Sequence, residues 1–396
     1  MRSDLAFTRS CAWQRLTLPL AGPYPWLRSA RPGLIFPLDA LTWLHGALVA
    51  KLQAACKSER DRWRGLRRLA IDKTTLTLPE SKSLWKAFGS HSGQQGLGPI
   101  AVELCCLFDL VSRAPLRFVY ARSSTSEHKL IRKLVEGLRK GDLLLMDNGF
   151  YYCQTFLRIL GRKAHFLIPA KITLRPQVLR TFAPGDYLCR ILDSHTREPL
   201  TVRVVFVYRN GFRRRRLITS LLDPSLYPAE ELAQLYHMRW DIETFYRDFK
   251  RTLNATSWHC QTPTTFHQEL IMHMIAVCLI RIAMLDASRL TSTPVGALSF
   301  VRVLTEARLF LQSILSAAAH ILWSLVWTQF VHSCAHHRVR AIPGRQFTRD
   351  RQEYRRKSRG LEKRRLGRKP KQTAPHTQPP KPESFKNLKG EIYLLS

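Results

Sequence analysis

The sequence predicts an α/β protein, and three observations lead to this fold class. Residues 66–121 contain three short apolar runs bounded by turn residues, as β-strands do. Residues 124–171 then alternate between segments of helical period and short apolar runs. Further β-type runs occupy residues 172–222, whereas the chain from Pro228 to roughly residue 335 has a helical pattern. Strands and helices therefore alternate in the first part of the chain, and a group of strands is followed by a group of helices in the second part.

The first elements follow from local signals. Residues 1–62 are rich in Trp, Leu and Arg, and after several prolines "PLDALTWLHGALVAKLQAAC" predicts a helix. Three strand-like runs come next, "LRRLAIDKTTLTL", "PIAVELCCLFDL" and "PLRFVYA", with "GSHSGQQGLG" as a loop. Three strands in close succession indicate an antiparallel meander.

Later elements are equally well marked. "STSEHKLIRKLVEGLRKG" predicts an amphipathic helix capped by Ser124 or Ser126 and stopped by Gly141. "DLLLMD" is a short apolar strand that ends in Asp147, "YYCQTFLRIL" is helical and "AHFLIPAK" is another strand. The last fifty or so residues are charge-dense and interrupted by proline, which predicts a disordered basic tail.

The charge of the chain points to its partner. Lys and Arg number 63 against 29 Asp and Glu, which gives a formal charge of +34. Such an excess repels itself unless a polyanion neutralises it, and nucleic acid is the commonest polyanion. The competing reading is a basic protein of the membrane surface. The apolar stretches 270–285 and 309–330 are interrupted by polar residues, so we expect buried helices and no membrane span.

Cysteine usage and the N-terminus bear on the compartment. Nine cysteines are scattered without a CxxC pair, which favours a reducing, cytoplasmic environment. No apolar signal-peptide core is visible near the N-terminus. A short cluster holds His332, Cys334, His336 and His337, but it lacks a second half at zinc-finger spacing, so a polar helix end is the preferred interpretation.

The stretch "YHMRWDIETFYRDFK" (236–250) has two chemically distinct faces when it is drawn as one helix. At about 100° per residue, Tyr236, Arg239, Glu243 and Lys250 fall within about 60° of arc. The apolar residues face the other way: Leu235, Met238, Ile242, Phe245 and Phe249. A solvated polar face would give the same pattern.

Two aspartates favour a more specific interpretation. Asp72 interrupts one strand-like run, and Asp147 closes another, where a carboxylate is costly unless a cation compensates it. Together with Glu243 they supply the hard oxygen ligands that Mg²⁺ or Mn²⁺ prefers. Three such carboxylates suit phosphoryl transfer with two divalent ions, in which Asp72 bridges both ions and the other two residues each complete one.

At these residues the chain resembles the DDE transposases of bacterial insertion sequences, of the insertion-sequence-four type. The signature of that family is spaced Y-x2-R-x3-E-x6-K, and Tyr236, Arg239, Glu243 and Lys250 match every spacing. "AIDKTTLTLPES" resembles the family's first aspartate motif and "LLLMDNGFY" its second. The similarity covers roughly residues 65–290.

The resemblance implies an RNase H-like catalytic core, a mixed sheet flanked by helices, interrupted by a β-rich insertion between Asp147 and Glu243. It implies a first core part at 63–170, the insertion at 171–224 and a second core part at 225–290. A helical N-terminal segment (1–62) that could assist DNA binding precedes them, and a helical region (291–343) and the basic tail (344–396) follow.

By the same resemblance, Asp72, Asp147 and Glu243 are the catalytic residues and ligands of two Mg²⁺ or Mn²⁺ ions. Tyr236, Arg239 and Lys250 contact DNA near the scissile bond. The partners are the transposon ends and target DNA, the synaptic complex holds a homodimer, and the setting is the bacterial nucleoid in the cytoplasm.

The chain departs from the family pattern in two places. Lys73 stands where glycine usually follows the first aspartate, which puts a bulky cation beside the expected metal site, and the segment before Asp72 is short for the family. Two alternatives therefore stay open: a transposase-derived DNA-binding protein that has lost cleavage, and an RNase H-like nuclease that hydrolyses DNA without joining it.

Overall fold

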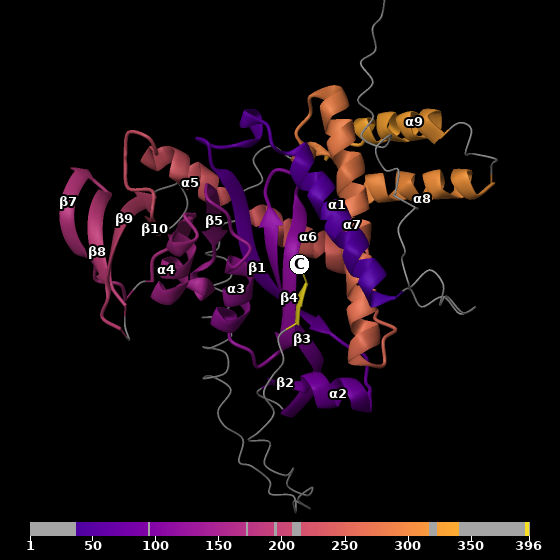
Figure 1. Cartoon of the computed structure of the whole chain (residues 1–396), viewed down its shortest axis with the longest axis horizontal. Helices are drawn as coiled ribbons and strands as arrows, with labels where there is room; N and C mark the ends of the chain where they lie inside the picture. The colour runs from indigo at the N-terminus through magenta and orange to yellow at the C-terminus, as the bar shows by residue number, and fades with distance from the viewer. Residues whose placement is uncertain are drawn as a thin grey trace, which may run out of the picture.

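The structure, a computed structural model, describes residues 37–93, 96–171, 173–193, 196–207, 215–316, 323–339 and 393–395. Within these residues, strands and helices build a mixed α/β fold (Figure 1), which confirms the predicted class. Two predictions fall largely outside the described residues: the N-terminal segment as far as residue 36, and the basic tail.

One mixed sheet organises the molecule. Its strands are β1 (Arg67–Thr77), β2 (Ser90–Gly93), β3 (Gly96–Asp109), β4 (Ala114–Arg122), β5 (Asp142–Met146), β6 (His165–Pro169), β7 (Gln177–Ala183), β8 (Asp186–Leu192), β9 (Pro199–Val207), β10 (Arg215–Thr219) and β11 (Tyr393–Leu395). The order is β11-β4-β3-β1-β5-β6-β10-β9-β8-β7, and β2 pairs with β3 beside this path. β1 is antiparallel to β3 but parallel to β5. The sheet therefore changes strand direction beside β1.

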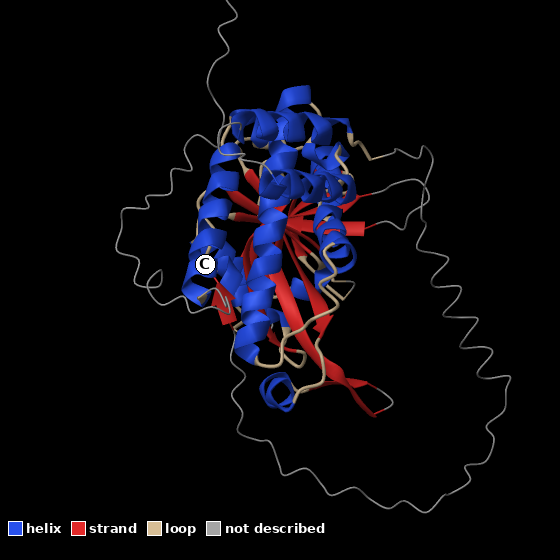
Figure 2. Ribbon diagram, turned by 90° about the vertical axis from the view of Figure 1, so that its right-hand side faces the viewer, coloured by secondary structure: helices blue, strands red, loops and turns tan. Residues whose placement is uncertain are grey.

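The helices surround this sheet (Figure 2). They are α1 (Leu38–Ala55), α2 (Lys82–Phe88), α3 (Glu127–Val135), α4 (Cys153–Gly161), α5 (Ala229–His237), α6 (Trp240–Arg247), α7 (Pro263–Thr291), α8 (Phe300–Ser316) and α9 (Trp323–His336). Single turns lie at η2 (Glu59–Asp61), η3 (Asn148–Phe150) and η5 (Val295–Ala297), and η4 (Asp248–Thr252) is a π-helical turn that follows α6 directly.

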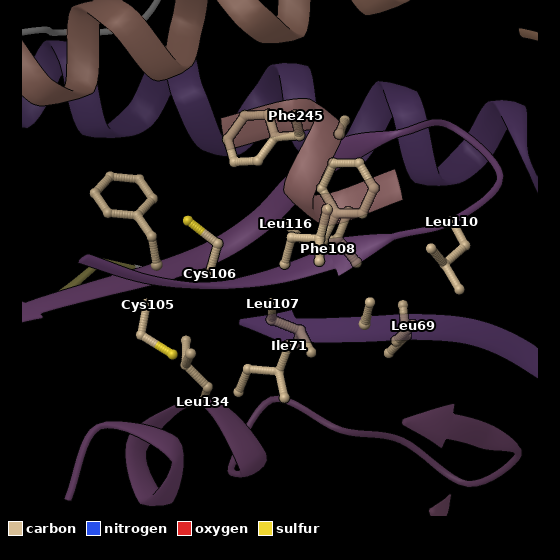
Figure 3. Close-up of a cluster of buried hydrophobic side chains, with 14 of the residues drawn as sticks. Leu69, Ile71, Cys105, Cys106, Leu107, Phe108, Leu110, Leu116, Leu134 and Phe245 are labelled. Atoms are coloured by element: carbon tan, nitrogen blue, oxygen red, sulfur yellow. The ribbon is translucent and has the colours of Figure 1, made fainter. Parts of the chain in front are cut away.

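The two faces of the sheet carry different helices. Along β3, Cys106 and Phe108 point toward Phe245 of α6, whereas Cys105 points toward Leu134 of α3 (Figure 3). This alternation follows from the two-residue period of a strand. All these side chains are almost completely buried. A residue of β1 or β3 can therefore be assigned to the α6 face or the α3 face from its register.

The predicted meander is confirmed, because β1, β3 and β4 are consecutive antiparallel neighbours. The predicted loop at 89–98 is wrong in part: β2 pairs with the start of β3, with Ser92 opposite Leu97. Glycine and serine carry no apolar alternation, so this hairpin left no strand signal in the sequence. The helix predicted from Ser126 ends at Val135, before Gly141, which has a positive φ and leads into β5.

The two long apolar stretches behave differently from each other. α7 has the length and composition of a membrane span, but 72% of its most apolar window is buried against other parts of the protein. It packs against α1, α8 and α9, as expected for a core helix. The second stretch is divided between α8 and α9. Leu309, Leu311 and Leu325 are more than half exposed, whereas Trp327 and Phe330 are buried, so the prediction of a buried helix there is wrong in part.

His45 on α1 is a buried histidine that makes the fold sensitive to acid. Its ring packs edge-on against Phe118, its Nε2 has no hydrogen-bond partner, and burial lowers its pKa to about 4. Because the unfolded chain binds the proton more readily, this residue costs stability as the pH falls from 6.5 toward 4. At pH 5 the cost is about 2 kcal/mol.

We therefore expect His45→Leu to gain stability over the wild type at pH 5 and to gain less at pH 7.5, as measured by urea unfolding. His332→Leu serves as the control, because that histidine is exposed on α9. An identical pH dependence in wild type and His45→Leu would show that this histidine does not account for the acid sensitivity.

Candidate active site

Asp72 and Asp147 come from neighbouring parallel strands. The register of β1 and β5 pairs Ile71 with Met146, so the residue that follows each of them lies at the same level of the sheet. Asp72 is on the α6 face, because it lies opposite Cys106 in the β1 and β3 ladder. The two aspartates therefore stand side by side where β5 ends.

Glu243 approaches the same place from α6. Its carboxylate accepts a hydrogen bond from Nη2 of Arg239 at 2.6 Å, and Nη1 of the same guanidinium lies 3.4 Å from the Asp72 carboxylate. Arg239 is only 4% exposed, whereas the Glu243 side chain is 37% exposed. One buried guanidinium thus bridges acids from two segments that are far apart in the sequence.

Burial and the charges of this cluster together shift the pKa of Asp72. Burial raises the pKa of its carboxyl to about 6, and the negative charges of Glu243 and Asp147 also raise it. Arg239 and the backbone N–H of Lys73 act in the opposite direction. Asp72 therefore lies in a place where more positive charge would be stabilising.

The donor set fits a divalent cation by its chemistry. Three carboxylates supply hard oxygen atoms, and one guanidinium, that of Arg239, bridges two of them. Nevertheless, the described residues include no group of three His, Cys, Asp or Glu side chains gathered closely enough to hold a metal ion. Arg239 lies among the carboxylates, so an ion would have to share or replace its interactions.

Tyr236 and Lys250 are hydrogen-bonded to the two strands that lead to the aspartates, Tyr236 to β5 and Lys250 to β1. Tyr236 is 8% exposed, and its hydroxyl donates to the carbonyl of Met146, directly before Asp147. Lys250 is half-buried, and its Nζ donates to the carbonyl of Thr75 at 2.7 Å. Burial lowers the pKa of Lys250, while Glu103 opposes that shift. Both residues thus attach the glutamate segment to the sheet.

The single helix expected over 236–250 is wrong. α5 ends at His237, and the next residues form tight i to i−3 hydrogen bonds, including Arg239 N–H to Tyr236 O and Ile242 N–H to Arg239 O. α6 then gives way to the wider π turn η4. A tight turn followed by a wide one alters the angles assumed for a regular helix. Even so, the side chains of Arg239 and Glu243 still form an ion pair, because the two residues are only four positions apart in the sequence.

Comparisons with known proteins establish which family the chain belongs to. The family model described as "Transposase DDE domain" matches residues 63–279, which is more than half of the chain and includes all six of these residues. The chain belongs to the DDE transposase family. The recognition based on the Tyr-Arg-Glu-Lys signature is therefore confirmed.

Two curated relatives of this transposase come from insertion sequences. It is 28% identical over 237 residues to "Transposase InsG for insertion sequence element IS4" of Escherichia coli, covering 56% of this chain and 53% of that protein. It is 22% identical over 242 residues to "Probable transposase for insertion sequence element IS5377" of Geobacillus stearothermophilus, covering 59% and 60% respectively. The chain thus spans little more than half the length of the curated relatives it matches.

A solved structure is also similar to part of this transposase. The "piggyBac transposase synaptic complex with hairpin DNA" matches with a TM-score of 0.39 and 12% sequence identity, covering 71% of this chain and 59% of that chain.

Lys73 of the transposase does not lie beside the carboxylate cluster, contrary to the sequence-based expectation. It follows Asp72 on a strand, so its side chain lies on the α3 face. There Nζ is 3.2 Å from Glu127 and 3.5 Å from Glu103, and these carboxylates help to raise the pKa of Lys73. The lysine that replaces glycine therefore adds an ion-pair network on the α3 face of the sheet, and its side chain does not block Asp72 on the α6 face.

Sequence reasoning missed Tyr246, which contacts the backbone of Asp72 in this transposase. Its hydroxyl donates to the Asp72 carbonyl at 2.6 Å and accepts from the Cys106 N–H at 3.2 Å. A tyrosine beside the buried Phe245 of α6 was the available signal, because a buried hydroxyl needs a partner. The sequence could not identify that partner.

In the described part of the transposase, no three side chains of the second cluster considered from the sequence are gathered closely enough to hold a metal ion. Cys334 is buried, and Nε2 of His337 lies 2.9 Å from Glu306 of α8. These residues hold the end of α9 against α8, in agreement with the interpretation as a polar helix end.

Proposed function

We propose that this transposase binds the terminal inverted repeats of its element and carries out metal-dependent DNA cleavage and strand transfer with Asp72, Asp147 and Glu243. The observation that carries the proposal is that Arg239 bridges the carboxylates of Asp72 on β1 and Glu243 on α6, while Asp147 follows β5 at the level of Asp72 on the neighbouring strand. Three carboxylates in a strongly basic protein suit a cation and a phosphate.

The proposal includes an RNase H-like core that spans 63–170 and 225–290. Supporting it are the neighbouring parallel strands of Asp72 and Asp147, the antiparallel β3 and β4, and the helices on both faces of the sheet. The strands β7 to β10 lie between Asp147 and Glu243 in sequence, which supports the assignment of residues 171–224 as an insertion. The N-terminal segment and the basic tail are proposed to add affinity for DNA.

When bound, two Mg²⁺ or Mn²⁺ ions would activate the attacking oxygen and stabilise the leaving oxygen at phosphorus. Asp72 would hold both ions, while Asp147 and Glu243 would each hold one. The parallel strands fix the two aspartates relative to each other, and the hydrogen bonds of Tyr236 and Lys250 to strand carbonyls fix the glutamate segment against them.

Tyr236, Arg239 and Lys250 are proposed to contact DNA as well. Lys250 needs the smallest conformational change to reach DNA. Its side chain is half-buried and donates to one backbone carbonyl, and a water molecule can donate to that carbonyl in its place. Arg239 must leave its carboxylates to reach a phosphate, which becomes less costly once cations take its place. We further propose that two copies act together, because joining two transposon ends requires two active sites.

Cleavage of DNA tests this function. The full chain is incubated with Mg²⁺ and a duplex that carries the element's terminal repeat next to flanking DNA, and both nicked and joined products are measured. We expect metal-dependent nicks followed by joined strands. Binding without cleavage would instead show a transposase-derived DNA-binding protein, and cleavage without joining would show a nuclease.

Glu243→Gln sharpens this test. Losing one metal ligand should remove several kcal/mol of transition-state stabilisation and slow cleavage at least about a hundredfold. Glu230→Gln is the matched control, because Glu230 is an exposed acid in the first turn of α5. Cleavage by Glu243→Gln at the wild-type rate would refute this assignment of the third carboxylate.

A further inference from the structure

Tyr246 joins the helix of one site carboxylate to the backbone of another. It is 6% exposed and lies on α6, three residues after Glu243. Its hydroxyl donates to the carbonyl of Asp72 at 2.6 Å and accepts from the N–H of Cys106 at 3.2 Å. Since Asp72 and Cys106 are partners in the β1 and β3 ladder, one side chain contacts both strands at the level of the site.

The geometry leaves this hydroxyl little freedom. Its single proton is used toward Asp72, and one of its lone pairs is used toward Cys106, so the oxygen is fixed in two directions. The ring lies 5.1 Å from Phe245, which itself packs on Phe108 of β3. Aromatic packing thus holds the ring while the hydrogen bonds hold its end.

Other anchors of the same segment reach different parts of the strands. Tyr236 bonds the carbonyl of Met146, and Lys250 bonds the carbonyl of Thr75. Among these three donors, Tyr246 alone bonds the backbone of a site carboxylate. It is not part of the four-residue signature.

We infer that Tyr246 is a positioning residue that sets the separation of Asp72 and Glu243. The inference rests on the proposed function for its catalytic meaning, because both carboxylates are assigned there as ligands of the same ions. Removing the hydroxyl leaves a buried N–H and a buried carbonyl without this partner. The two strands can satisfy these groups only by moving closer, which shifts Asp72, or the groups remain unpaired at a cost in stability.

The test is the affinity of the full chain for Mn²⁺, measured by calorimetry without DNA. In Tyr246→Phe we expect Mn²⁺ to bind at least about tenfold more weakly, as is typical when a residue that orients metal ligands is lost. In DNA cleavage the same variant should need more Mg²⁺ for half-maximal rate, with an unchanged affinity for DNA. A purely structural tyrosine would lower the melting temperature and leave both metal dependences unchanged.

Tyr187→Phe is the matched control. The Tyr187 hydroxyl also accepts a backbone N–H, from Gly185, but it lies on β8 away from the carboxylates. Wild-type Mn²⁺ affinity in Tyr246→Phe would overturn the inference, whatever the enzyme does with DNA. Absence of cleavage in the wild type, with weaker Mn²⁺ binding in Tyr246→Phe, would refute the proposed function and uphold the positioning role.

Discussion

Asp72→Asn is expected to abolish DNA cleavage and yet make the metal-free protein more stable at neutral pH. The loss of cleavage should be at least about a thousandfold, because the proposed bridging ligand would be missing for both ions. The gain in stability follows from the environment of Asp72, whose pKa rises from 3.8 to about 6 mainly through burial. A carboxyl that is easier to protonate in the folded state destabilises that state once it is charged.

The sign gives a specific pH dependence. Between pH 3.8 and 6 the folded protein binds the proton more readily than the unfolded chain, so the contribution of Asp72 to stability falls as the pH rises through this range. At pH 7.5 the cost reaches about 3 kcal/mol at most. Asparagine has no such charge, so we expect a gain of about 1–3 kcal/mol at pH 7.5 and little at pH 4.

Urea unfolding in EDTA at the two pH values measures this difference. Asp39→Asn is a suitable control, because Asp39 is an exposed acid in the first turn of α1. Lower stability of Asp72→Asn than wild type at pH 7.5 would contradict the burial argument.

Arg239→Met is expected to destabilise the metal-free protein strongly and to make it more responsive to Mn²⁺. Arg239 is buried and pairs with both Asp72 and Glu243, so removing it leaves two carboxylates without their shared cation, at a cost of about 3–5 kcal/mol. Asp72→Asn differs, because it removes one of the negative charges and leaves Arg239 paired with Glu243. The same loss removes a cation with which a metal ion must compete. Mn²⁺ should therefore raise the melting temperature of Arg239→Met more than that of the wild type.

Thermal unfolding with and without Mn²⁺ measures both effects. Arg247→Met is the control on the same helix, because the Arg247 side chain is 60% exposed. If Mn²⁺ stabilises Arg239→Met no more than the wild type, Arg239 does not occupy the place of an ion.

Much of the site could be predicted from the sequence because its residues carry local signals. Asp72 and Asp147 stand out as charges in apolar strands, and the four-residue spacing of Arg239 and Glu243 survives in the structure. The alternation along β1 also decides which side chains share a face. Because side chains alternate along a strand, Asp72 and Lys73 lie on opposite faces of the sheet, and helices cover both faces.

The remaining features depend on contacts between distant segments. The partners of Lys73, Glu103 and Glu127, lie on β3 and α3, and the bond from Tyr246 to Asp72 joins residues 174 positions apart in the sequence. The break between α5 and α6 follows from this packing, because Tyr236 must reach the carbonyl of Met146 while Glu243 faces Asp72. A regular helical wheel contains no information about either requirement.

The continuous sheet limits how this protein can be divided. β10 is hydrogen-bonded to β6, and β6 to β5, so the strands β7 to β10 extend the layer that carries Asp147 (Figure 1). Deleting residues 177–219 would expose the backbone groups along one edge of β6, and such an edge recruits other chains. A shortened version of the protein would therefore tend to aggregate, and dissection of its activity is better attempted through point substitutions than through excision of these strands.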